Sequence, residues 1–302
     1  MVRLGLCCLF REAPIKFRRT TAAFLSRMTR RDQLDRLADI AMHNARSLKA
    51  ALVFCRDRGI GAFRINSQIL PLKTHPEVGY AVTDLPDAEA IIRSFVQCGA
   101  FARENHLRTS FHPDQFIVLA SPDQGVYRRS LADLEYHAEV AGWVGADVIN
   151  VHGGGAYNDK PATLARLSRR IEKLPAVIRT RLTLENDDRV YTPGDLLPVC
   201  ERTGVPLAYD VHHHRCLPDG LSEAVVTEKA IATWGREPLF HVSSPLGGRG
   251  APNCRPHHDY IDPGDFPSGW RTLDITVDVE AKAKELAVLK LSDDLQLNTK
   301  YP

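Results

Sequence analysis

Short apolar runs rich in β-branched residues alternate with longer amphipathic segments along a chain of 302 residues. Eight such runs are expected to form strands, at residues 2–9, 60–66, 107–111, 148–151, 182–185, 206–211, 238–243 and 273–280. Between them, apolar residues recur every three or four positions, as in helices that bury one face. Helices are therefore expected at residues 31–58, 88–106, 127–144, 161–174, 193–203, 221–234 and 281–295.

This alternation predicts an α/β fold, and eight strand–helix pairs favour a single (β/α)8 TIM-type barrel that occupies residues 1–302 as one domain. The structural alternative is an open, doubly wound sheet. Such a sheet usually has a glycine-rich turn after its first strand. Cys7-Cys8-Leu9-Phe10 stands at that place, so the closed barrel is the better interpretation.

Composition points to a chain of the cytoplasm, which would be associated with the nucleoid if its substrate is DNA. No apolar stretch is long enough to span a membrane. The seven cysteines include no Cys-x-x-Cys pair, and their number is odd, so we expect them to be reduced. A net charge of +2 does not by itself indicate nucleic acid.

Metal-binding residue types gather where the expected strands end, and that is where a β/α barrel builds its active site. Seven of the eight strand ends supply a His, Asp or Glu. Nine of the twelve histidines lie in these segments, at positions 75, 112, 152, 212, 213, 214, 241, 257 and 258. Because strand neighbours alternate faces, at most two of His212, His213 and His214 are expected to reach a common site.

A single His at a strand end is at least as often an ordinary hydrogen-bonding residue, and Glu185 or Asp210 could cap a helix. Together, however, these residues predict a metal site. The nine candidate ligands are His75, His112, His152, Glu185, Asp210, His213, His241, His257 and Glu280. Nine ligands exceed the needs of one ion and imply two or three, with Glu185 and Glu280 able to bridge them. Such clusters suit phosphodiester hydrolysis.

A phosphate contact is suggested after the fourth strand. Gly153-Gly154-Gly155 would let the backbone approach an anion, and Lys160 lies just beyond. A triple glycine is a weak signal, and the ordinary interpretation is a flexible loop.

The strand-end motifs closely resemble those of the UV-damage endonuclease family, from about Arg3 to Leu291. Among them are Phe111-His112-Pro113-Asp114-Gln115-Phe116, Val151-His152-Gly153-Gly154-Gly155-Ala156-Tyr157-Asn158-Asp159-Lys160, Leu184-Glu185-Asn186-Asp187 and Asp210-Val211-His212-His213-His214. The other matching stretches are residues 64–67, 71–76, 241–245, 257–261 and 280–284.

The resemblance implies a metal-dependent DNA repair endonuclease that nicks the strand 5′ to UV photoproducts and related lesions in double-stranded DNA. It implies manganese-type ions on the nine ligands. Mixed His and carboxylate sites also accept zinc or iron, and we expect a monomer. Glu185, Glu280 and Lys160 would serve catalysis. Gln115 and Phe116 would match a Gln-Tyr pair that the family inserts at the lesion.

The chain departs from the family pattern at three positions. Phe116 lacks the phenol hydroxyl of the family's Tyr, which affects lesion preference. Leu6 stands where the family can carry another aromatic residue. Leu239 occupies the position of a lysine that can be carboxylated, so no carboxylated lysine is carried over.

Two other functions fit the same residues. A small-molecule metalloenzyme of the xylose-isomerase-like scaffold, such as a sugar isomerase or a multinuclear metal oxidase, would keep the strand-end ligands but need no DNA groove. A non-enzymatic DNA-binding barrel would need no ligand cluster at all, and unpaired buried carboxylates would be costly in it.

Overall fold

All eight expected strands form one parallel sheet in the computed structural model, which describes residues 1–114 and 116–297. They are β1 (Arg3–Cys7), β2 (Ala62–Ile65), β3 (Arg108–Phe111), β4 (Val148–His152), β5 (Leu182–Glu185), β6 (Leu207–Ala208), β7 (Leu239–Val242) and β8 (Thr276–Val279). The sheet order is β6-β5-β4-β3-β2-β1-β8-β7. Asp210 bridges His241 between the two edge strands, and the His241 amide donates to the Tyr209 carbonyl at 3.0 Å. The sheet closes into a barrel, which confirms the predicted fold class.

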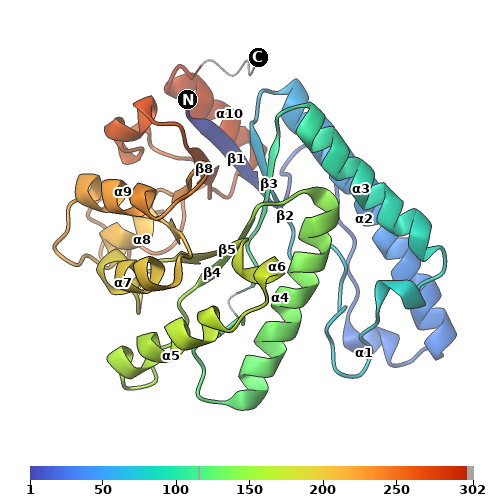
Figure 1. Cartoon of the computed structure of the whole chain (residues 1–302). Coiled ribbons are helices and arrows are strands. Elements are labelled where there is room, and N and C mark those ends of the chain that lie inside the picture. The colour runs from blue at the N-terminus through green and yellow to red at the C-terminus, as the bar shows by residue number, and fades with distance from the viewer. Residues whose placement is uncertain (115, 298–302) are drawn as a thin grey trace.

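Helices surround the strands, as Figure 1 shows. They are α1 (Ala22–Leu25), α2 (Arg30–Asp57), α3 (Ala88–Glu104), α4 (Gln124–Val144), α5 (Lys160–Glu172), α6 (Ala176–Arg179), α7 (Pro193–Thr203), α8 (Val211–Cys216), α9 (Glu223–Ala232) and α10 (Glu285–Asp294). Short 3-10 turns are η1 (Val82–Asp84), η2 (Pro263–Asp265) and η3 (Ser268–Thr272). Each of the seven predicted helices is present. Within the described residues, no helix has the length and apolar character that crossing a membrane requires.

The strands divide their side chains between two environments. Val277 and Val279 are fully buried in the apolar layer between strands and helices. Asp278, between them in β8, is also buried, and it belongs to the opposite, polar face with Glu280 just beyond the strand. Because strand residues alternate faces, the apolar side chains pack against the helices. The polar side chains point into the barrel, near the carboxyl ends of the strands.

The sixth strand is shorter than predicted, and this corrects the interpretation of His212, His213 and His214. Asp210 accepts a hydrogen bond from the His213 amide at 2.8 Å and caps helix α8, which begins at Val211. The three histidines therefore follow a helix rather than a strand, and they diverge by about 100° per residue. His213 turns toward the strand ends, whereas His214 contacts the Tyr209 hydroxyl at 2.8 Å.

Helix α4 carries a buried histidine that predicts a pH-dependent stability. His137 is 4% exposed, packs against Phe111 and Tyr136, and contacts the Asp133 carbonyl through Nδ1 at 2.7 Å. Burial lowers the pKa of His137 to about 4. The unfolded chain, with its histidine pKa near 6.5, therefore binds this proton first as the pH falls.

The stability that His137 contributes is thus complete above about pH 6.5 and is lost between about pH 6.5 and 4. We expect the loss to reach about 3 kcal/mol. Urea unfolding of the chain and of His137→Gln, both in EDTA, measures it: the difference in unfolding free energy should shrink as the pH falls from 7.5 to 4.5. A difference that does not change with pH would refute the assignment.

Candidate metal centre

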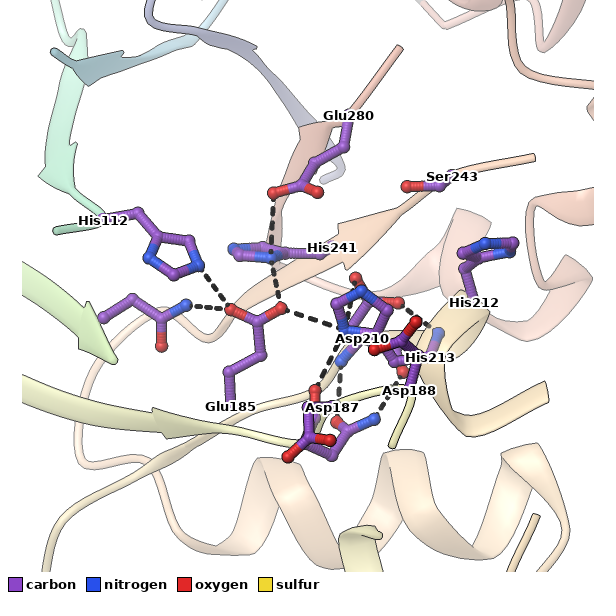
Figure 2. Close-up of polar contacts among 12 residues, drawn as sticks. His112, Glu185, Asp187, Asp188, Asp210, His212, His213, His241, Ser243 and Glu280 are labelled. Carbon is purple, nitrogen blue, oxygen red and sulfur yellow. Dashed lines mark hydrogen bonds and ion pairs between the residues drawn. The ribbon is translucent and has the colours of Figure 1, made fainter. Parts of the chain in front are cut away.

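Glu185, the last residue of β5, lies at the centre of the side chains that gather above the barrel (Figure 2). Its carboxylate is fully buried. Oε2 lies 2.8 Å from His112 Nε2, and Oε1 lies 3.2 Å from His241 Nδ1 and 3.3 Å from His213 Nδ1. Side chains from the residue after β3, from β7 and from α8 thus converge on one carboxylate. The predicted convergence of strand ends is the reason, because parallel strands finish at the same end of a barrel.

Seven of the nine predicted ligands fall into three overlapping groups that could each hold an ion. The groups are His112, His152 and Glu185; His112, His241 and Glu280; and Glu185, Asp210 and His213. Within a group the ligand atoms lie within 4.8 Å of one another. Glu185 belongs to two groups and His112 to two. We call these seven residues the Glu185 cluster.

Several potential ligand atoms in the Glu185 cluster are buried without a hydrogen bond of normal geometry, and some of them have only the ion-pair contacts described above. They include Glu185 Oε1, Asp210 Oδ2, His152 Nδ1 and both ring nitrogens of His241. Unsatisfied buried polar atoms are rare, because each one loses its hydration without compensation. Imidazole nitrogens and carboxylate oxygens aimed at common points fit divalent cations such as Mn²⁺, Zn²⁺ or Fe²⁺.

Burial and charge act in opposite directions on the pKa values of the cluster. Burial favours a neutral Glu185, but His241, His152 and His112 outweigh it and hold the carboxyl pKa well below its ordinary value. Burial also disfavours a charged His241, yet Glu185 raises the pKa of that imidazole to about 9. The pair is therefore ionised near neutral pH. A cation that takes the same donors must displace the histidine proton.

Glu280, just beyond β8, is held by an arginine from β2. Arg64 Nη1 lies 2.5 Å from Glu280 Oε1, and both side chains are largely buried. Burial raises the pKa of Glu280, but Arg64 and then His241 overcome it and leave the pKa well below its ordinary range. The carboxylate thus stays charged beside His241 Nδ1, which lies 3.4 Å away.

Residues below the cluster orient its members, and the sequence analysis did not select them. Thr183 Oγ1 donates to Asn150 Oδ1 at 2.8 Å, and Asn150 Nδ2 donates to Glu185 Oε2. Asn186 exchanges two hydrogen bonds with the backbone of Asp210, at 2.8 and 3.0 Å. Such partners fix the orientation of a ligand and are often as important as the ligand itself.

Asp278 is a further buried carboxylate beneath the cluster. Its Oδ2 lies 3.9 Å from His241 Nε2 and 4.0 Å from Arg64 Nη1, and neither of its oxygens has a hydrogen bond. Burial raises the pKa of Asp278 despite these two cations. Gly5 in β1 makes room for it, because a Cβ at Gly5 would overlap Asp278 Oδ1. The signal that could have revealed Asp278, Asn150 and Arg64 is a polar residue at the inward positions of otherwise apolar strands.

His257 reaches the edge of the cluster from the long loop after β7. Its Nδ1 lies 3.9 Å from Glu280 Oε2, and its ring centroid lies 6.3 Å from that of His213. A disulfide joins this loop to α8 through Cys216 and Cys254, whose Cα atoms are 5.8 Å apart. The prediction of uniformly reduced cysteines is therefore wrong for this pair. It holds for the five others, which are free.

The disulfide closes 38 residues and is expected to stabilise the fold by about 2–4 kcal/mol, since it limits the unfolded chain. Oxidised protein unfolded in denaturant should show five titratable thiols, and seven after reduction. Cys216→Ser should lower the urea midpoint of unfolding, and reduction of the disulfide by dithiothreitol should lower it by the same amount. Seven thiols without reductant would rule the disulfide out. A matched control is Cys200→Ser, at a free buried cysteine.

Four predicted site residues lie apart from the Glu185 cluster or outside the described residues. His75 lies in the loop after β2, where its Nδ1 accepts from the Glu77 amide at 3.2 Å. Lys160, at the start of α5, pairs with Asp195 at 2.9 Å. Within residues 1–114 and 116–297, neither side chain contacts the cluster. Gln115 falls outside the described residues, whereas its neighbour Phe116 is 76% exposed in the loop after β3.

The triple glycine after β4 has a packing role. A Cβ at Gly153 would lie 2.7 Å from the Tyr191 ring, and one at Gly154, where φ is +85°, would lie 2.8 Å from Val118 Cγ1. Only glycine permits these approaches. The glycines thus let the loop pack closely against Tyr191 and Val118, and this packing accounts for them without a flexible loop.

Comparison with known proteins places this geometry in a family context. The model of the family described as UV-endonuclease UvdE matches residues 2–301. A UV DNA damage endonuclease of Bacillus velezensis is 35% identical over 95% of this chain and 91% of its own length. One from Bacillus pumilus is 32% identical over 91% of this chain and 87% of its own length.

Solved structures agree. A crystal structure of SacUVDE has a TM-score of 0.88 with 29% identity, and the match covers 99% of this chain and 100% of that one. Endonuclease IV from Thermus thermophilus, at 17% identity and a TM-score of 0.60, covers 82% of this chain and 93% of its own. A D-psicose 3-epimerase from Clostridium cellulolyticum has 12% identity and a TM-score of 0.58, and the match covers 97% of this chain and 96% of that one. The last two are similar in fold alone.

Proposed function

Because the chain belongs to the UV-endonuclease UvdE family, we propose that it is a DNA repair endonuclease that nicks damaged duplex DNA on the 5′ side of UV photoproducts and related lesions. The observation that carries the proposal is the Glu185 cluster, seven convergent ligands at the functional end of the barrel. We further propose that the protein works as a monomer in the cytoplasm, at the nucleoid.

The proposed metal set is two or three divalent ions, Mn²⁺ first and Zn²⁺ or Fe²⁺ as alternatives. The Glu185 cluster supplies His112, His152, Glu185, Asp210, His213, His241 and Glu280 as ligands. His257 would add a ligand at the edge, beside Glu280, and His75 would complete the set from the loop after β2. His75 is the least supported member, because its Nδ1 is already engaged with the backbone.

When bound, divalent metals supply an activated water for attack on the phosphodiester and neutralise charge on its oxygens. The residues of this chain position that chemistry. Glu185, which two ligand groups share, and Glu280, which belongs to the group with His112 and His241, are proposed as the catalytic carboxylates, held by Asn150 and Arg64 respectively. Lys160 would contact a phosphate at the rim, after release from Asp195.

Lesion recognition is proposed for the loop after β3. Phe116, which follows Gln115 in the sequence, exposes an apolar ring, and an exposed ring can wedge into a duplex at a weakly stacked step. A damaged site costs less to open than an intact pair, so selectivity follows from deformability.

The test is cleavage of an end-labelled duplex that contains one thymine photoproduct, beside an abasic duplex and an undamaged one. We expect Mn²⁺ to support a single cut immediately 5′ to the lesion and EDTA to abolish it. Equal cutting of the undamaged duplex, or no cutting with any of Mn²⁺, Zn²⁺ and Fe²⁺, would contradict the proposal.

A further inference from the structure

Tyr157 is an exposed aromatic residue in the loop after β4, five residues beyond His152. Its side chain is 41% exposed. Within residues 1–114 and 116–297, its hydroxyl has no hydrogen-bond partner, and its ring makes no aromatic contact with another side chain. Large aromatic side chains usually bury most of their surface on folding. The loops that follow barrel strands line the functional end of the fold, so an exposed ring in this loop is available to a ligand.

The backbone of Tyr157 adopts a conformation that bulky residues rarely take. Its φ is +50°, and that of Asn158 is +64°. For a residue other than glycine or asparagine, this left-handed region costs of order 1 kcal/mol, and such residues cluster at functional sites. Tyr157 belongs to none of the three ligand groups, and within the described residues no hydrogen bond or ring–ring contact of its side chain offsets this cost.

The loop nevertheless holds the ring in a defined place. Tyr191 Oη donates to the Gly155 carbonyl at 3.2 Å, and Thr163 Oγ1 donates to the Ala156 carbonyl at 2.8 Å. The Tyr157 ring lies over Gly155, where a Cβ would come within 3.5 Å of Cζ. A ring fixed before binding loses little entropy when it stacks on a ligand.

The same loop is packed against the segment that carries Phe116. Gly154 lies so close to Val118 that a Cβ would approach Cγ1 to 2.8 Å, and Val118 is two residues from Phe116. Strands β3 and β4 are paired neighbours, so two exposed aromatic residues stand on adjacent loops at the end of the barrel that holds the Glu185 cluster.

We propose that Tyr157 stacks on an unpaired nucleobase at the lesion, as a second aromatic contact beside Phe116. This inference rests on the proposed function. Every base presents a flat π face, so the contact needs no particular sequence. The free hydroxyl also offers the hydrogen-bonding phenol that Phe116 lacks. Tyr157 acts here in binding and selectivity, with no part in the chemical step.

The experiment measures the affinity of lesion-bearing and undamaged duplexes by fluorescence anisotropy in Ca²⁺ and the nicking constants in Mn²⁺. Tyr157→Asn removes the ring, and asparagine tolerates a positive φ, so the loop keeps its conformation. Tyr157→Phe keeps the ring. Val177→Asn is the surface control, because Val177 is 53% exposed in α6, which precedes β5 and so lies at the other end of the barrel.

We expect Tyr157→Asn to bind the lesion duplex about 10-fold more weakly, with undamaged duplex little affected, KM raised and kcat nearly unchanged. Tyr157→Phe should retain most of the affinity. 2-Aminopurine placed opposite the lesion should be quenched less by the Asn variant than by the unchanged protein. Val177→Asn should match the unchanged protein in every assay.

Three results would overturn the inference: unchanged lesion affinity in Tyr157→Asn, equal weakening on both duplexes, or a Phe variant as weak as the Asn variant. An equal loss on both duplexes would mean a general backbone contact. If the unchanged protein itself neither binds nor nicks lesion duplex, the proposed function fails instead, and the two failures are distinguishable.

Discussion

Glu185→Gln should lower the nicking rate by about 10²–10³-fold or more, because one carboxylate serves two ligand groups. The amide has the same size and can still accept from Asn150, so the fold should survive. It lacks the charge that holds His112, His213 and His241 around it, at 2.8, 3.3 and 3.2 Å. The measurement is single-turnover nicking of lesion duplex, with metal content determined on the same samples.

A matched control for this substitution is Glu172→Gln. Glu172 ends helix α5 and pairs with Arg202 at the surface, at 2.9 Å, so the same chemical change there leaves the cluster intact. We expect it to retain full nicking and full metal content. Retention of both by Glu185→Gln would remove Glu185 from the site.

Metal removal should lower the thermal stability of the protein substantially. A ligand that binds only the folded state stabilises it by about 2.7 kcal/mol at a hundred times its Kd. For a chain of this size, that corresponds to roughly 4 °C in Tm per site. Mn²⁺ should therefore raise the Tm of EDTA-treated protein, and should raise that of Glu185→Gln far less. An identical Tm with and without Mn²⁺ would contradict the cluster as a metal site.

The same shift should grow with pH. The pKa of His241 is raised to about 9 by Glu185, and that of His213 stands well above its ordinary value because Asp210 and Glu185 outweigh the effect of burial. Protons therefore compete with metal below those pKa values, and affinity rises as the pH rises. We expect a larger Mn²⁺-induced Tm shift at pH 8 than at pH 6. A larger Tm shift at pH 6 would mean that metal binding does not displace protons from these histidines.

The barrel and most of the site could be predicted from the sequence because two periodicities carry the information. Strand ends of a parallel barrel must meet, so His112, His152, Glu185, His241 and Glu280 were placed together by topology alone. The helical histidines were less visible. Asp210 is a helix-capping residue type three positions before His213, and that signal could have ended the sixth strand at Ala208.

Other features have no local signature. Cys216 and Cys254 are 38 residues apart, and cysteine spacing does not reveal which pair lies close in the fold. The position of His75 depends on how its loop bonds to its own backbone. Asn150 and Asp278 were accessible in principle, because a polar residue at an inward strand position is costly unless a site uses it.

The central claim is that the protein nicks lesion-bearing DNA with divalent metals bound to the Glu185 cluster. The most direct test measures the nicking rate of a single-lesion duplex against the number of Mn²⁺ ions bound per chain, in one titration of metal-free protein. We predict that the rate rises until two to three ions are bound and then stays constant, with a cut 5′ to the lesion. A full rate at less than one ion per chain would contradict it.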